Sequence, residues 1–197
     1  MTTLLDFLSI GKQLDELYEF LKKVKSDISE YSRELSNKEI KQVLKDFKKG
    51  VAETHIICIK IIEADEVEKQ MLGKSLNISK KEREEIGQKI GLIAQELERI
   101  VKIPAVDHFI GERPVLSKQM YRTMKMRAMV KRVWFEEAES LKAIPDEELY
   151  DRKIRIKNDP TYDIEHALQI LFIKHMKQLD RSAVELIKVL DTTIDSL

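Results

Sequence analysis

The sequence predicts an all-α protein: an antiparallel bundle of four to five long helices with one short helix in a connection. Apolar residues recur at the three- and four-residue spacing of a helix face through most of the chain. Glycine (6) and proline (4) are too scarce to punctuate the many short strands of an all-β fold. The hydrophobic fraction of 43% supplies a core for a single domain over residues 1–197.

The first predicted helix covers about residues 3–34. Its apolar residues repeat in the heptad pattern of a coiled coil, at Leu14, Leu17, Leu21, Val24, Ile28, Tyr31 and Leu35. The second predicted helix begins after Ser36, which forms a capping box with Glu39, and ends at Gly73. Its middle, residues 56–62, is apolar on nearly every face, so we expect it to be the central helix of the domain or part of a subunit interface.

The remaining helices are marked by their caps. Ser79 and Glu82 form a second capping box that opens a helix over about 80–102, which Pro104 ends. Residues 103–116 show no helical period and are expected to be a long connection. A fourth helix follows over about 118–143, a short fifth over 145–157 and a sixth over 160–195, the last two each opened by a proline.

Several function classes are disfavoured by composition and by missing motifs. The net charge is zero, so any attraction to nucleic acid or membrane must come from a local patch. A single cysteine, Cys58, allows neither an intrachain disulfide nor a cysteine-based zinc site. No secretory signal or membrane span is apparent, which leads us to expect a cytoplasmic protein. The glycine-rich nucleotide-binding motifs and the common hydrolase motifs are absent, which disfavours the families that carry them. The sequence therefore favours a protein that is not an enzyme without deciding the question, and it predicts no cofactor other than the metal ion considered below.

A basic face on the fourth helix is the clearest charge asymmetry. Residues 113–132 hold seven basic residues and no acidic one. Four of them fall within about 80° of arc on one helix face: Lys118, Arg122, Lys125 and Arg132. Tyr121 lies beside them and could stack on a base. The pattern predicts a contact with nucleic acid or another anionic partner, and its alternative is a solvated face or an ion-pair network.

Histidines and one aspartate suggest a metal site as a second hypothesis. Asp163 and His166 are spaced i, i+3, and His55 precedes Cys58 by three residues. His175 lies in the centre of the apolar arc of the last helix, roughly opposite His166, and is expected to be buried. The alternative is that these imidazoles are structural and hydrogen-bonded within the protein.

The function predicted from these features is that of a helical-bundle interaction or scaffold protein. We expect it to self-associate as a dimer, because the first helix carries a coiled-coil seam and the second is apolar all round. The basic face of the fourth helix would add an anion or nucleic-acid contact. The alternatives are a ferritin-like metal-binding bundle and a dedicated nucleic-acid-binding protein.

Overall fold

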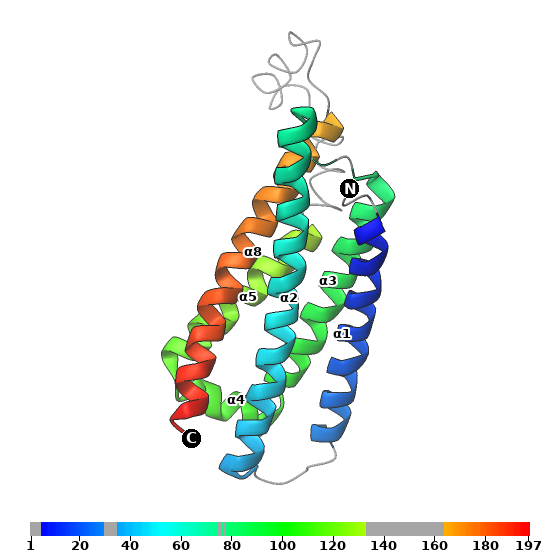
Figure 1. Ribbon diagram of the computed structural model, residues 1–197. Coiled ribbons are helices and arrows are strands. Elements are labelled where there is room, and N and C mark those ends of the chain that lie inside the picture. Colours follow the sequence, from blue (N-terminus) through cyan, green and yellow to red (C-terminus); the bar gives the residue numbers. More distant parts are fainter. Residues whose placement is uncertain (1–4, 30–34, 75, 77, 133–163) are drawn as a thin grey trace, which may run out of the picture.

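A computed structural model describes residues 5–29, 35–74, 76, 78–132 and 164–197 of the chain. This part contains six helices and no strand, which confirms the all-α prediction (Figure 1). The helices are α1 (Leu5–Ser29), α2 (Asn37–Leu72), α3 (Lys80–Val101), α4 (Pro104–Gly111), α5 (Pro114–Arg132) and α8 (Ile164–Asp195). The helix predicted over 145–157 and the predicted extension of the fourth helix to 143 lie outside the described residues.

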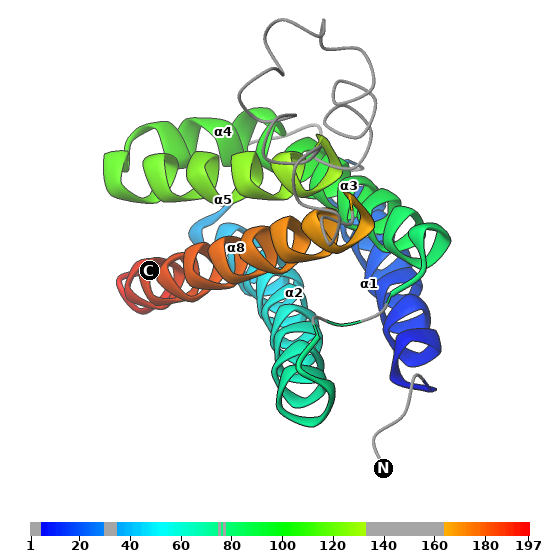
Figure 2. The same ribbon diagram turned by 90° about the horizontal axis from the view of Figure 1, so that it is seen from above.

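The long helices form a closed ring around one core. Seen from above, α1 packs on α3, α3 on α5, α5 on α8, α8 on α2 and α2 again on α1 (Figure 2). Neighbours in this ring run antiparallel, except α1 and α3, which run in the same direction (Figure 1). Their parallel register is fixed where Lys89 Nζ donates to Asp15 Oδ2 at 2.6 Å and to the Gly11 carbonyl at 3.1 Å. The chain passes from α2 to the far side of α1 before α3 begins, and α3 therefore pairs with α1.

Three of the predicted helix ends, at Ser36, Gly73 and Ser79, are confirmed by their hydrogen bonds and backbone conformation. The Glu39 N–H donates to Ser36 Oγ at 3.4 Å, and the Ser36 N–H donates to Glu39 Oε2 at 2.8 Å. Ser79 and Glu82 repeat this reciprocal pair at the start of α3. Gly73 ends α2 with φ of 65°, the left-handed conformation in which a side chain would be strained. Each cap satisfies backbone groups that the helix itself leaves without partners.

The connection predicted over residues 103–116 is wrong in one respect, because it contains α4. Pro104 and Pro114 do not interrupt helices here; they open α4 and α5, where a missing N–H costs nothing. Helix α5 consequently begins at Pro114 and not after Ser117. The apolar residues that bury α4 are Val106, Phe109 and Ile110. Three residues are too few to establish a helical period in the sequence.

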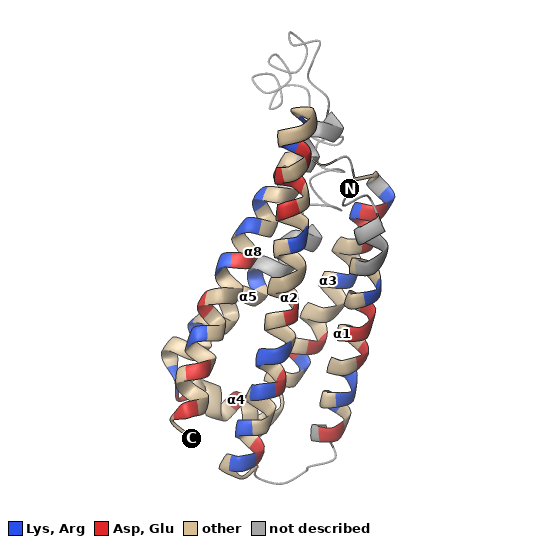
Figure 3. Cartoon of the chain, in the orientation of Figure 1, with Lys and Arg blue, Asp and Glu red and all other residues tan. Residues whose placement is uncertain are grey.

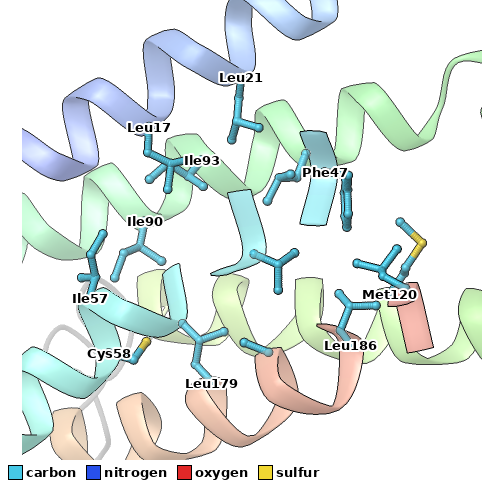
Figure 4. Packing of buried hydrophobic residues seen from close by; sticks show 14 of the residues in the cluster. Leu17, Leu21, Phe47, Ile57, Cys58, Ile90, Ile93, Met120, Leu179 and Leu186 are labelled. Carbon is cyan, nitrogen blue, oxygen red and sulfur yellow. The ribbon is translucent and has the colours of Figure 1, made fainter. Parts of the chain in front are cut away.

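The heptad seam of α1 faces the interior of its own chain. Ile10, Leu14, Leu17, Leu21 and Val24 are all buried in the single hydrophobic cluster. Figure 4 shows Leu17 close to Ile93 of α3 and Leu21 on the side that faces Phe47 of α2. The seam is therefore covered within the bundle, and it gives no support to pairing with a second copy.

A buried aspartate fixes the connection between α2 and α3. Asp65 is fully buried, and its Oδ1 accepts a hydrogen bond from the Leu76 N–H at 2.9 Å. Its Oδ2 lies 2.7 Å from Lys69 Nζ, one helical turn further along α2. Leu76 and Ile78 are buried in the core on the other side of this contact. The carboxylate thus holds the connection against the bundle while Lys69 balances its charge.

Candidate interaction surfaces

The basic face predicted on the fourth helix lies on the outside of α5. Lys118, Tyr121, Arg122 and Lys125 are exposed, and Tyr121 most of all at 71%. The Arg132 side chain lies outside the described residues. Arg122 is 3.0 Å from Glu185 Oε2 on α8, so one cation of the face is already paired. Lys118 and Lys125 form no ion pair with any described residue, and they flank the exposed ring of Tyr121.

The predicted metal ligands are not brought together by the described part of the chain. His55 Nδ1 lies 2.6 Å from Asp180 Oδ1, in a half-buried contact between α2 and α8. The side chains of Asp163 and His166 lie outside the described residues. Among the residues that are described, no three histidine, cysteine, aspartate or glutamate side chains are grouped to hold a metal ion. His55 therefore has the hydrogen-bonded role that was the alternative to a metal site.

His175 is half-buried, and the prediction that it lies at the centre of the buried face is wrong. That face of α8 is centred instead on Phe172, Met176, Ala183 and Leu190, which are all buried. At 100° per residue His175 stands about 60° from this centre. The helix packs against both α2 and α5, so its buried arc is wider than the stripe used for the prediction.

The outer face of α2 is exposed, so the expectation that α2 is the central helix of the domain is wrong, and the alternative of a subunit interface is left as a prediction. Helix α2 packs on α8 along one side and on α1 along the other. The face between these contacts, called here the outer face, carries Lys38, Lys41, Lys45, Lys49, Ala52, Ile56, Ile59, Glu63 and Val67. Ile56 is 43% exposed and Val67 45%, whereas the adjacent Ile57 and Cys58 are buried. Isoleucines of this stretch thus divide between the core and the surface.

Charge is separated along α2 in a way that the analysis of sequence motifs missed. Residues 37–50 contain five lysines and two acidic residues, a net charge of +3, and residues 51–72 contain two lysines and five acidic residues, a net charge of −3. Figure 3 shows the lysines gathered toward the lower half of α2. Lys48 pairs with Asp191 of α8, and Glu66 with Lys177 at 2.7 Å. Summing the charge of each half of the helix would have revealed the separation.

Part of this charge has no partner in the described chain. Lys38, Lys45 and Glu63 are exposed on the outer face of α2 and make no ion pair with a described residue. The helix dipole does not explain the arrangement, because it favours acidic residues near the start of a helix and basic residues near its end. The outer face therefore combines exposed apolar side chains with opposite charges at its two ends.

The fold and these surfaces define a helical-bundle protein whose candidate sites lie on its outer surface. Comparison with known proteins adds no family to this description: no protein family, curated protein or solved structure matches the chain. Within the described ranges, none of the helices has an apolar stretch long enough to cross a bilayer.

Proposed function

We propose that this chain is a helical-bundle interaction protein that associates with a second copy of itself through the outer face of α2. The observation that carries the proposal is the exposure of Ile56 and Val67 on a face whose two ends bear opposite charge. Burial of exposed apolar side chains drives association. Opposite charges at the two ends specify the orientation in which that burial occurs.

A two-fold axis across α2 pairs the face with itself in an antiparallel sense. The lysines of the basic half, Lys38, Lys41, Lys45 and Lys49, then lie along the acidic half of the partner, where Glu63 is exposed on the outer face. An axis at the level of residues 54–56 brings Glu63 of one copy level with residues 45–49 of the other. Ile56 lies at the axis in this arrangement and meets its own counterpart. A parallel arrangement would set like charges against each other along the whole helix.

Sedimentation equilibrium of the full chain tests the association. We expect a mass of about twice 23.0 kDa at low micromolar concentration. A mass of 23.0 kDa at every concentration up to the high micromolar range would reject the proposal.

A matched pair of variants tests the face. Ile56→Asp should shift the protein toward monomer, because it places a charge at the centre of the contact. Leu92→Asp is the control, since Leu92 lies on α3 and is exposed to 42%, against 43% for Ile56. If Leu92→Asp dissociated the protein and Ile56→Asp did not, the interface would not lie on α2.

Charge reversal tests the antiparallel orientation. Glu63→Lys should weaken association at low salt, and adding Lys49→Glu to the same chain should restore it. Both effects should fade as salt is raised. Equal association of the single and double variants at low salt would contradict the arrangement about residues 54–56.

A second candidate function is anion or nucleic-acid binding by α5. It is favoured by the exposed ring of Tyr121 between Lys118 and Lys125, since an aromatic ring beside cations suits a single-stranded nucleic acid. Titration of a fluorescent single-stranded oligonucleotide across salt concentrations tests it. Lys118→Ala with Lys125→Ala should weaken binding and flatten the salt dependence, and Tyr121→Ala should weaken binding without changing that slope. An unchanged salt slope in the lysine variant would reject α5 as the site.

A further inference from the structure

A cationic groove lies on the outside of α8, beside the last turn of α2. It has a volume of about 360 Å³ and is lined mainly by Lys69 of α2 and by Ile170, Ile173, Lys174, Lys177 and Arg181 of α8. The α8 residues stand at i, i+3, i+4, i+7 and i+11 of one helix face. The volume falls within the range of about 300–1,000 Å³ that is typical of sites for small ligands.

Two of the cations that line the groove are paired with carboxylates, and two are not. Lys69 is held by the buried Asp65 at 2.7 Å, and Lys177 by Glu66 at 2.7 Å. These two ion pairs fix the ammonium groups in place and neutralise them. Lys174 and Arg181 are exposed and form no ion pair with a described residue. Four cations less two carboxylates leave the groove with a net charge of +2.

The apolar part of the groove distinguishes it from an ordinary basic patch. Ile173 is buried and forms part of the floor, while Ile170 is 50% exposed at the edge. No aromatic side chain is among the described lining residues, so the groove offers no surface on which a base could stack. A ligand that satisfies both parts carries an anionic group for the cations and a hydrocarbon portion for the isoleucines.

We propose that this groove binds a small amphiphilic anion, a phosphate or carboxylate attached to a short alkyl chain. The anionic group lies between Lys174 and Arg181, whose charges have no carboxylate to balance them in the described chain. The alkyl chain lies against Ile170 and Ile173 and is removed from water. This site is separate from the outer face of α2 and from the basic face of α5, and it does not depend on the function proposed for either.

Isothermal titration calorimetry of the full chain with three probes tests the ligand class. Octyl phosphate below its micellar concentration should bind at least about tenfold more tightly than inorganic phosphate, because alkyl carbons are buried in addition. Octyl glucoside, which has the same tail and no charge, should not bind measurably. Equal affinity for the two phosphates would overturn the apolar half of the proposal, and binding of octyl glucoside would overturn the anionic half.

Variants on the surface of α8 test the site. Lys174→Glu with Arg181→Glu should weaken octyl phosphate binding by at least about tenfold, and Ile170→Asn should remove most of its advantage over inorganic phosphate. Lys188→Glu is the control, because Lys188 is an exposed cation of the same helix outside the groove. Circular dichroism checks that each variant is folded. An equal loss of affinity for octyl phosphate in the control and in the double variant would reject the groove as the site.

A further arm distinguishes a soluble amphiphile from a membrane lipid. Vesicles that contain phosphatidic acid present the same phosphate with its alkyl chains held in a bilayer. A groove of about 360 Å³ accepts a single free chain, so we expect binding of octyl phosphate without co-sedimentation with these vesicles. Vesicle binding in the absence of octyl phosphate binding would overturn the proposal in favour of a membrane-surface contact.

Discussion

Asp65 shows how one side chain links the sequence to the fold. It is the acidic residue of α2 that is buried completely, and its carboxylate makes both a backbone hydrogen bond and an ion pair. A buried carboxylate is costly unless it is satisfied in this way. Its place on α2, one turn before Lys69, allows a single helix to supply both the anion and its counter-ion. The connection to α3 is also anchored by two buried apolar side chains and by the buried Arg83, whose Nη1 donates to the Ile78 carbonyl at 2.9 Å.

We expect Asp65→Ala to lower the free energy of unfolding by about 2–4 kcal/mol, because it leaves the buried Leu76 N–H without a partner. Urea denaturation followed by far-ultraviolet circular dichroism measures the change. Asp27→Ala is the matched control, because Asp27 is an exposed aspartate of α1 away from the outer face of α2, and it should change stability by no more than about 0.5 kcal/mol. Equal stability of the two variants would show that the carboxylate does not hold the connection.

Gly50 sets how closely α2 approaches α1. A Cβ at this position would stand 3.1 Å from Leu21 Cδ2, the far end of a flexible side chain. We expect the free energy of unfolding of Gly50→Ala to lie within about 1 kcal/mol of that of the wild type. The gain in helix propensity offsets the cost of a small shift of Leu21. Gly50→Ile should destabilise by about 2 kcal/mol or more, since the added carbons have no space. Thermal unfolding compares the pair, and a stabilised Gly50→Ile would mean that the α1–α2 contact is looser than its geometry indicates.

At the scale of single elements, helix ends with a capping signal could be predicted, whereas the start of α5 at Pro114 and the surroundings of each helix could not. The capping boxes at Ser36 and Ser79 and the terminal Gly73 are local signals, because the atoms involved lie within one or two turns. The division of α2 into inner and outer faces is different. Ile56 and Ile57 are chemically identical, yet one is exposed and the other buried, because only the ring order decides which face meets α8 and α1.

The candidate sites also divide into those that could be predicted from the sequence and those that could not. The α5 face could be predicted, since it depends on spacing within one helix. The contact of His55 with Asp180 and the groove on α8 could not, because each requires knowing that α2 and α8 are neighbours. The basic residues of α8 do repeat at i, i+3 and i+7, and that spacing was a signal for the groove that could have been used.

The contact between α2 and α8 should be sensitive to acid through Glu66. A hydrogen bond from Lys177 holds the pKa of the Glu66 carboxyl below its ordinary value of 4.5. A group whose pKa is lowered by folding stabilises the fold above its unfolded pKa, and that contribution is lost as the pH falls through the folded pKa. We therefore expect the free energy of unfolding to fall as the pH drops below 4.5.

Glu66→Gln should make this decline shallower, because glutamine has no proton to gain. Asp27→Asn, at an exposed position of α1 without an ion pair in the described chain, is the control and should leave the pH dependence nearly unchanged. The titration of the Glu66 side chain, followed by NMR, gives an independent measure. A Glu66 pKa at or above 4.5 would show that the ion pair does not persist in solution.

At the scale of the molecule, the ring order explains both the core and the open surface. Each long helix has two neighbours in the ring, so each buries one broad face and leaves another outside. In α1 the buried face takes up the described part of the heptad seam, from Ile10 to Val24. In α2 the apolar residues exceed what two neighbours cover, and the surplus forms the outer face. Two features of the sequence suggested a dimer. The heptad seam of α1 packs inside the chain, whereas the apolar residues on the outer face of α2 remain exposed and could contact a second copy.

The single cysteine makes it possible to test whether the chain unfolds as one domain. Cys58 is fully buried between α2 and α8, within the one hydrophobic cluster to which the core residues belong. Because this cluster joins the long helices, we expect loss of helix and exposure of the thiol to occur in one cooperative transition. Labelling with a thiol reagent in native buffer should be slowed by at least about 10³-fold relative to the denatured chain. In urea, the midpoint of rapid labelling should coincide with the midpoint measured by circular dichroism. If the thiol became reactive at a clearly lower urea concentration, α2 and α8 would separate before the ring unfolds, and the chain would consist of more than one folding unit.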